Sequence, residues 1–286
     1  MNTSLGLEGK KYHVNGINMN VVIEGQGPDV LLVHGFPDSS EVWRHQIPAL
    51  VAAGYRAIAP DLRGFGESTA PPNTADYKVD LLVSDLIGVL NALGVPKVRL
   101  VGHDWGSAIC WHTCIQHPDR IDRYVALSVG HPSAYAHGGI LQKLKSYYII
   151  FFQFKGVSEW MVTRADWALW RQMMCYDPEF PTWKRDLSRP GRLTAALNYY
   201  RANLDLVLPK PWSKVSMPVM GVWGEGDVAT AEQQMIESEK FVAASWRYER
   251  IGNKAGHWLM LSAPEKFNAL LLDYLHQELP ETGSDL

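Results

Sequence analysis

The sequence lacks the features of secreted and membrane-spanning proteins. Its 286 residues include only three cysteines, a sparse and odd number that argues against a disulfide framework and for a reducing compartment. No apolar run approaches the roughly 20 residues that cross a bilayer. Residues 1–11 carry no basic start followed by an apolar stretch, so no secretory signal is visible. We expect a soluble, cytoplasmic protein without a membrane span.

Neither sign of charge is in excess. The chain has 27 Lys and Arg against 30 Asp and Glu, a formal charge of -3, so no overall field draws it onto nucleic acid or an anionic membrane. Repeats and low-complexity segments are also absent. We therefore expect a small-molecule partner and no nucleic acid, and the sequence leaves open whether the protein is a monomer or a homodimer.

What the sequence does contain is a pattern of alternating strands and helices. Short apolar runs at 30–33, 57–59, 98–101, 219–223 and 245–251 predict strands. Helical spacing predicts a helix at about 79–90, a polar helix from about residue 230 and a last helix at 265–279. This alternation is typical of an α/β fold with a mostly parallel sheet.

The pattern changes between residues 135 and 212. Strand signals disappear there, and helical stretches rich in Trp and Tyr hold 15 of the 31 aromatic residues of the chain. In open parallel sheets the ligand binds beyond the carboxyl ends of the strands, so an insertion at that edge would cover the site. We predict a core domain from residues 1–134 and 213–286, and a helical cap domain from residues 135–212.

A turn after the strand at 98–101 carries the first chemical signal. Residues 102–106 read Gly-His-Asp-Trp-Gly, which is the spacing of the nucleophile elbow G-x-S-x-G with Asp104 in the place of the serine. Taken alone, this motif fits equally well an ordinary turn whose Asp caps the next helix.

Three other signals resolve that ambiguity. Asp227 follows a strand, and His257 precedes the last helix, which gives the chain order nucleophile, acid, histidine of an α/β-hydrolase triad. Upstream, residues 34–37 read His-Gly-Phe-Pro after a strand, where such enzymes place a backbone N–H of the oxyanion hole. All four signals occur in the expected order and context.

On these motifs the chain resembles the α/β-hydrolase superfamily, and specifically its epoxide hydrolase branch, over nearly its full length. Residues 61–68, Asp-Leu-Arg-Gly-Phe-Gly-Glu-Ser, and 256–258, Gly-His-Trp, belong to the same resemblance. It implies an eight-stranded, mostly parallel sheet flanked by helices, with an inserted α-helical cap.

Two segments of the insertion resemble those that carry the ring-opening tyrosines of that branch. Residues 148–156 and 198–201 give, by this resemblance, Tyr148 and Tyr200. Physical reasoning leaves the choice open, because neighbouring helical residues point about 100° apart and only one of each pair, Tyr147 or Tyr148 and Tyr199 or Tyr200, can face Asp104. Aromatic residues in such apolar runs are more often part of a core.

The resemblance implies an epoxide hydrolase mechanism that uses no metal and no organic cofactor. Asp104 would open a small apolar epoxide to form an alkyl ester, and water activated by the His257–Asp227 pair would hydrolyse the ester to a vicinal diol. The backbone N–H groups of Phe36 and Trp105 would stabilise the oxyanion. The side chains implied to contact the substrate are Phe36, Trp105, Tyr148, Tyr200 and Trp258.

Two kinds of dehalogenase and a non-catalytic binding protein are the alternatives to an epoxide hydrolase. Haloalkane dehalogenases use the same nucleophile but typically have Asn where Phe36 stands, and haloacetate dehalogenases usually have arginines where Trp105 and Ala108 stand. A non-catalytic binder would not need nucleophile, acid and histidine together. The sequence therefore favours an epoxide over a halide substrate, with a binding protein as the remote alternative.

Overall fold

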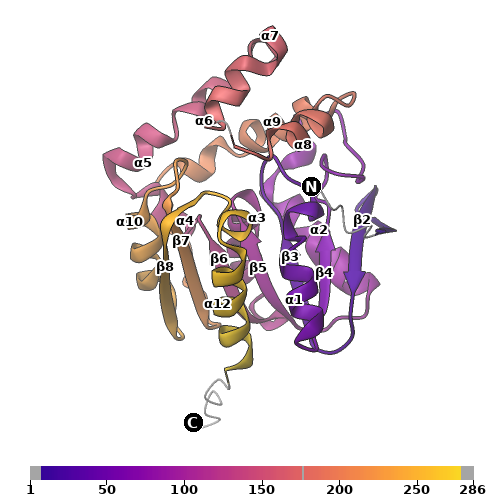
Figure 1. Ribbon diagram of the computed structural model, residues 1–286, viewed down its shortest axis with the longest axis vertical. Coiled ribbons are helices and arrows are strands. Elements are labelled where there is room, and N and C mark those ends of the chain that lie inside the picture. Colours follow the sequence, from indigo (N-terminus) through magenta and orange to yellow (C-terminus); the bar gives the residue numbers. More distant parts are fainter. Residues whose placement is uncertain (1–7, 176, 278–286) are drawn as a thin grey trace.

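A mixed sheet of eight strands forms the centre of the protein, whose computed structural model describes residues 8–175 and 177–277 (Figure 1). The strands lie in the order β1–β2–β4–β3–β5–β6–β7–β8. Their bounds are β1 Lys10–Val14, β2 Ile17–Glu24, β3 Asp29–Val33, β4 Arg56–Pro60, β5 Val98–His103, β6 Ile121–Leu127, β7 Val219–Gly226 and β8 Trp246–Gly256. β2 is antiparallel to β1 and β4, and all other pairs are parallel. The predicted fold class is confirmed.

The sequence pattern predicts five of the eight strands. β3, β4, β5, β7 and β8 overlap the five predicted stretches. The first four are mostly buried, and strands buried on both faces read as continuous apolar runs. β1, β2 and β6 are not predicted individually. β1 lies at the sheet edge with most of its side chains exposed, and β6 has two successive charged residues after its first residue, so neither has such a run from its start.

Helices cover both faces of the sheet (Figure 1). α1 (Gln46–Ala52) and α12 (Pro264–His276) contact each other on one face, and α2 (Val79–Ala92) and α3 (Trp105–Gln116) contact each other on the opposite face. The predicted helices at 79–90 and 265–279 correspond to α2 and α12, and residues 278 and 279 lie outside the described residues. The predicted polar helix is α10 (Glu232–Ile236), followed in the chain by the short α11 (Leu259–Ser262).

Between β6 and β7 the described residues form six α-helices, of which α5 to α9 lie beyond one end of the sheet, at the top of Figure 1. They are α4 (Pro132–Ala136), α5 (Gly139–Lys145), α6 (Tyr147–Phe152), α7 (Val157–Met173), α8 (Phe180–Leu187) and α9 (Arg192–Ala202), and we call them the inserted helices. The predicted domain boundary after residue 134 falls within α4, so the division into domains stays a prediction.

The inserted helices contact loops that follow four different strands. Trp183 of α8 bonds to the loop after β3, and Tyr199 of α9 bonds to the loop after β4. Tyr200 of α9 packs on Trp105 after β5, and Lys145 of α5 donates to the loop after β7. These are the carboxyl ends of parallel strands, the edge at which α/β sheets bind their ligands.

The loop after β4 is held by buried polar contacts. Asp61 accepts the backbone N–H groups of Ser40 and Glu67, each at 2.8 Å. Arg63 forms a two-pronged ion pair with Asp85 of α2, at 2.6 and 2.7 Å, and both side chains are almost fully buried. These contacts fix the Arg63 carbonyl on which α9 is anchored.

None of the helices in residues 8–175 and 177–277 is both long and apolar enough to cross a bilayer. The three cysteines are free: Cys110 and Cys114 are buried in α3, and Cys175 is exposed.

The turn between β5 and α3 requires close backbone packing. Asp104 has φ 51° and ψ -121°, a sparsely populated conformation for a residue with a side chain. A Cβ atom on Gly106 would lie 2.1 Å from the carbonyl oxygen of Val33, and one on Gly35 would lie 2.5 Å from the Cβ atom of Asp104. Glycine at both positions therefore lets the β3 and β5 loops meet at Asp104.

We predict that Gly106→Ala destabilises the protein, because the added methyl group must displace backbone rather than a flexible side chain. The free energy of unfolding, measured by urea denaturation, should fall by roughly 1–3 kcal/mol or more. Gly252→Ala is the matched control, since its Cβ atom would meet nothing closer than 3.7 Å. Equal stability of the two variants would contradict this account of the turn.

Candidate active site

Asp104 is the centre of the candidate site and lies at the junction of β5 and α3. Its side chain is buried, with 8% of the residue exposed. Its Oδ1 atom accepts the backbone N–H of Phe36 at 2.9 Å, and its Oδ2 atom lies 3.4 Å from Nε2 of His257. One carboxylate oxygen is thus held by the backbone, while the other faces the imidazole.

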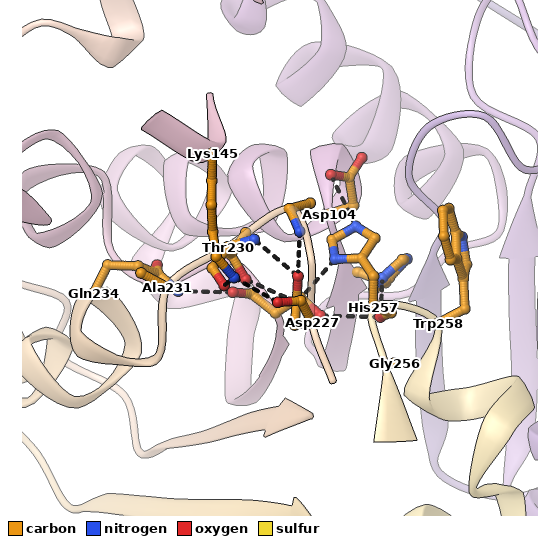
Figure 2. A network of polar contacts seen from close by, with 12 residues as sticks. Asp104, Lys145, Asp227, Thr230, Ala231, Gln234, Gly256, His257 and Trp258 are labelled. Carbon is orange, nitrogen blue, oxygen red and sulfur yellow. Dashed lines mark hydrogen bonds and ion pairs between the residues drawn. The ribbon is translucent and has the colours of Figure 1, made fainter. Parts of the chain in front are cut away.

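His257 lies between two carboxylates, as Figure 2 shows. Its Nδ1 atom is 2.9 Å from Oδ2 of Asp227, on the loop after β7. Asp227 in turn accepts hydrogen bonds from the backbone N–H groups of Ala229 and Thr230 and from the Thr230 hydroxyl, each at 2.8 Å. The sequence reasoning did not single out Thr230, which completes the hydrogen bonding of the buried Asp227 carboxylate. Asp227 therefore orients the imidazole toward Asp104.

The backbone around His257 is also held by hydrogen bonds. Its carbonyl oxygen lies 3.0 Å from Nε2 of His103 and accepts the Ser128 hydroxyl at 3.1 Å. Lys145 of α5 donates to the carbonyl oxygens of Asp227 and Thr230 (Figure 2). An inserted helix thereby supports the loop that carries the acid. His34 instead shapes its own loop, with Nε2 accepting the N–H of Leu62.

Electrostatics favour a charged triad in the free enzyme. Burial works against the charged imidazole, but the Asp227 and Asp104 carboxylates outweigh it and raise the pKa of His257 to about 10. Burial likewise disfavours the Asp227 carboxylate, but His257 and Thr230 lower its pKa to about 2. The pKa of Asp104 is also lowered, because His257 outweighs the cost of burial. One buried positive charge thus balances two buried carboxylates.

The expected oxyanion-hole groups lie beside Asp104. The Phe36 N–H already donates to its carboxylate. Trp105 is the first residue of α3, where backbone N–H groups have no partner within the helix and the helix dipole favours negative charge. Both N–H groups come from backbone fixed by the close-packed turn.

Two cavities border the carboxylate, and both are lined by Asp104, Tyr148 and Tyr200. The first, which we call the inner cavity, continues past Trp105 and Ala108 of α3 and has only buried or half-buried residues in its wall. The second, the outer cavity, continues past Phe36, Phe152 and Trp258, and its wall includes the exposed Cys175 and Val228. The five residues expected to contact substrate all line one of these cavities.

The structure separates each candidate tyrosine from its neighbour. Tyr147 is 62% exposed, whereas Tyr148 is half-buried and lines both cavities. Tyr199 is fully buried and donates its hydroxyl to the Arg63 carbonyl at 2.8 Å, which turns Tyr200 toward Asp104. Burial raises the pKa of both Tyr148 and Tyr200 well above its usual value, so both phenols stay protonated. These are the two tyrosines implied by the resemblance.

Asp38 is a buried residue beside the site that the sequence reasoning missed. It directly follows His34-Gly-Phe-Pro37, a position that could have drawn attention to it. Its two oxygens accept the indole N–H groups of Trp183 in α8 at 2.7 Å and of Trp258 at 2.8 Å. Burial raises the pKa of Asp38 to about 7, despite both donors. Asp38 therefore joins an inserted helix to the residue after the candidate catalytic histidine.

The sheet order and the turn at Asp104 define a protein of the α/β-hydrolase class. Residues 28–159 match the family model described as the alpha/beta hydrolase fold. Within that superfamily, the chain belongs to the epoxide hydrolase branch.

The relatives on which this assignment depends extend over most of the chain. Epoxide hydrolase 3 of Xenopus tropicalis is 33% identical over 283 residues, which cover 92% of this chain and 76% of that protein. Epoxide hydrolase 2 of Siraitia grosvenorii is 34% identical over 303 residues, covering 91% and 96%. The crystal structure of an epoxide hydrolase from Bacillus megaterium in complex with an inhibitor superposes with a TM-score of 0.84 at 27% identity, covering 94% of this chain and all of that one.

We predict that Asp227→Asn lowers the pKa of His257. Of the two carboxylates that favour the imidazolium, Asp227 contributes more to its raised pKa, and the substitution removes that negative charge. In the wild type His257 should stay protonated from neutral pH to about pH 10, and in the variant it should lose its proton at a clearly lower pH. Imidazole nitrogen chemical shifts followed by NMR against pH measure both midpoints. An unchanged midpoint would contradict the proposed charge balance.

Proposed function

We propose that this protein is an epoxide hydrolase that converts epoxides to vicinal diols through an ester on Asp104. The observation that carries the proposal is the position of two phenols, Tyr148 and Tyr200, which border the same two cavities as the Asp104 carboxylate. Membership of the epoxide hydrolase branch supports the same activity. In this reading the inserted helices are a cap that supplies both phenols.

In the first step, the Oδ2 atom of Asp104 attacks an epoxide carbon and the ring C–O bond breaks. The departing oxygen would be an alkoxide, so protonated donors beside it accelerate the step by roughly 10²–10⁴. Tyr148 and Tyr200 provide those donors, and one of them transfers its proton to the oxygen and is left as a tyrosinate. The tyrosinate regains a proton from solvent when the His257 imidazolium releases its own, before the second step. The Phe36 N–H remains on Oδ1, which becomes the carbonyl oxygen of the ester.

In the second step, His257 removes a proton from water, and the hydroxide attacks the ester carbonyl carbon. Esterification of Asp104 removes one of the two charges that raise the pKa of His257, so the imidazole becomes neutral more readily at this stage. The tetrahedral oxyanion on Oδ1 is stabilised by the N–H groups of Phe36 and Trp105. Asp227 stabilises the imidazolium. As the intermediate collapses, the bond between the Asp104 carboxyl carbon and the substrate oxygen breaks, and the imidazolium protonates that oxygen to release the diol. The Asp104 carboxylic acid then returns a proton to His257, which restores the resting charges. All groups in this scheme are side chains, backbone N–H groups and water.

The leaving group separates this proposal from dehalogenation. A halide leaves without needing a proton, so two proton-donating phenols beside the nucleophile would have no role in its departure. A carboxylate-bearing substrate such as haloacetate would need a cation, and Trp105 and Ala108 line the cavity where the related enzymes usually have arginines.

The low cysteine content remains the support for a cytoplasmic location, and both monomer and homodimer remain compatible with the proposal.

We predict that Tyr148→Phe with Tyr200→Phe reduces epoxide hydrolysis by about 10²–10⁴, because the departing oxygen loses both donors. The matched control is Tyr147→Phe with Tyr199→Phe, which removes the same two hydroxyl groups from neighbouring positions. The control should keep most of its activity, although losing the hydroxyl bond to Arg63 should lower its melting temperature. Steady-state kinetics on aryl and alkyl epoxides compare the pairs, and full activity in the first pair would refute the assignment.

We predict that His257→Gln traps the ester, because glutamine cannot activate water while Asp104 can still attack. Denatured protein analysed by mass spectrometry after incubation with an epoxide should be heavier by the mass of that epoxide, with the addition on the peptide containing Asp104.

A single turnover of the wild type in heavy-oxygen water tests the same intermediate independently. The label should enter Asp104, because the diol oxygen on the attacked carbon comes from its carboxylate. Label found in the diol on the first turnover would rule out a covalent ester.

A further inference from the structure

The inner cavity has an unusual polar group in its wall. Trp105, Ala108 and His112 of α3 all border it, at the three- and four-residue spacing that places side chains on one helix face. At about 1.5 Å per residue, the Cα atom of His112 lies roughly 12 Å along the helix from that of Asp104. The cavity thus extends from the nucleophile along two turns of α3.

Most of the wall around that path is apolar. Val129, Pro132, Leu206 and Val207 contribute apolar surface to it. Every residue of the wall is buried or half-buried. Such a channel favours an apolar chain, because burying it releases water from apolar surface.

His112 departs from this apolar character. It is 1% exposed, and its Nδ1 atom is buried without a hydrogen-bond partner in the described part of the chain. Its ring packs edge to face on Trp212, with centroids 4.6 Å apart, and the Trp212 Nε1 atom is also buried and unpartnered there. In the part of the chain that the structure describes, His112 is the one residue of the inner and outer cavity walls that has a buried unpartnered nitrogen. Buried polar groups in folded proteins nearly always have a partner.

The charge state of His112 limits what that partner can be. Burial lowers its pKa to about 4, so the ring is neutral at physiological pH. Three charged groups act on the ring from outside the cavity wall: Asp80, which accepts a hydrogen bond from Gln116, and Lys210 and Asp205, which are paired with each other. A neutral imidazole offers one donor and one acceptor, which suits a hydroxyl group. A carboxylate or an ammonium group would be buried here without a counter-charge, which is costly.

We propose that the inner cavity binds one substituent of the epoxide and that His112 hydrogen-bonds a hydroxyl group carried on that substituent. The preferred substrates are then epoxides whose apolar chain ends in a hydroxyl group at the distance that separates Asp104 from His112. This inference rests on the proposed function, because it places the epoxide ring at Asp104. His112 sets specificity and takes no part in the chemical steps.

The test compares kcat/KM for two series of terminal epoxides of increasing chain length, one ending in a hydroxyl group and the other in a methyl group. In the wild type the hydroxyl series should be preferred only at lengths that reach His112. His112→Phe should reduce that preference by about tenfold, the effect of one lost hydrogen bond in a buried site, and His112→Gln should retain part of it.

His117→Phe is the matched control, since it makes the same change on the same helix end but outside both cavity walls. Its substrate preference should equal that of the wild type. Ala108→Leu should disfavour the long members of both series, because it narrows the cavity between Asp104 and His112.

A measurement on the unaltered protein covers the case in which the His112 variants do not fold. The diol products that end in a hydroxyl group should shift the imidazole nitrogen resonances of His112 in NMR spectra, and the methyl-ended diols should not. Two results would overturn this inference alone. One is that wild type and His112→Phe turn over both series with the same preference for the hydroxyl-ended substrates. The other is that both kinds of diol shift the His112 resonances equally. Absence of turnover on every epoxide would overturn the proposed function and this inference with it.

Discussion

The site depends on one electrostatic balance, in which a buried imidazolium lies between two buried carboxylates. Asp104 and Asp227 each lose their bound water on folding. The contacts of each carboxylate with His257 and with backbone N–H groups offset the cost of that loss. Asp104 accepts the Phe36 N–H and lies at the start of α3, where the helix dipole favours negative charge. Asp227 accepts hydrogen bonds from the loop that contains Thr230. Much of the local backbone can be understood as the support that this balance requires.

The balance also explains how a histidine that is protonated in the free enzyme can act as the base in the second step of the proposed reaction. While Asp104 is charged, the imidazole holds a proton and cannot act as a base. When Asp104 becomes an ester, the balance shifts toward the neutral ring. In the proposed mechanism, the charge of Asp104 therefore sets when His257 can act as a base.

The inserted helices connect to this centre through polar anchors at their edges and aromatic contacts over the cavity. Asp38 holds the indole groups of Trp183 and Trp258, and Tyr199 is bonded to the loop after β4. With these anchors in place, Tyr148 and Tyr200 pack against each other with ring centroids 5.7 Å apart. The same arrangement leaves an inner cavity whose apolar wall includes a polar histidine, the basis of the inferred substrate preference.

The sequence by itself predicted five of the eight strands, the order of Asp104, Asp227 and His257 along the chain, and the loss of strands between β6 and β7. These features depend on local patterns: continuous apolar runs, glycines at a tight turn and a change in composition. It did not determine which tyrosine of each pair faces Asp104. Both members of a pair are the same amino acid on the same helix, and they differ only in the direction in which their side chains point. The packed structure separates the pairs: Tyr199 is bonded to Arg63, 136 positions away in the chain, and Tyr147 is largely exposed. Asp38 and His112 acquired their surroundings in the same way, since burial and missing partners are properties of packed tertiary structure.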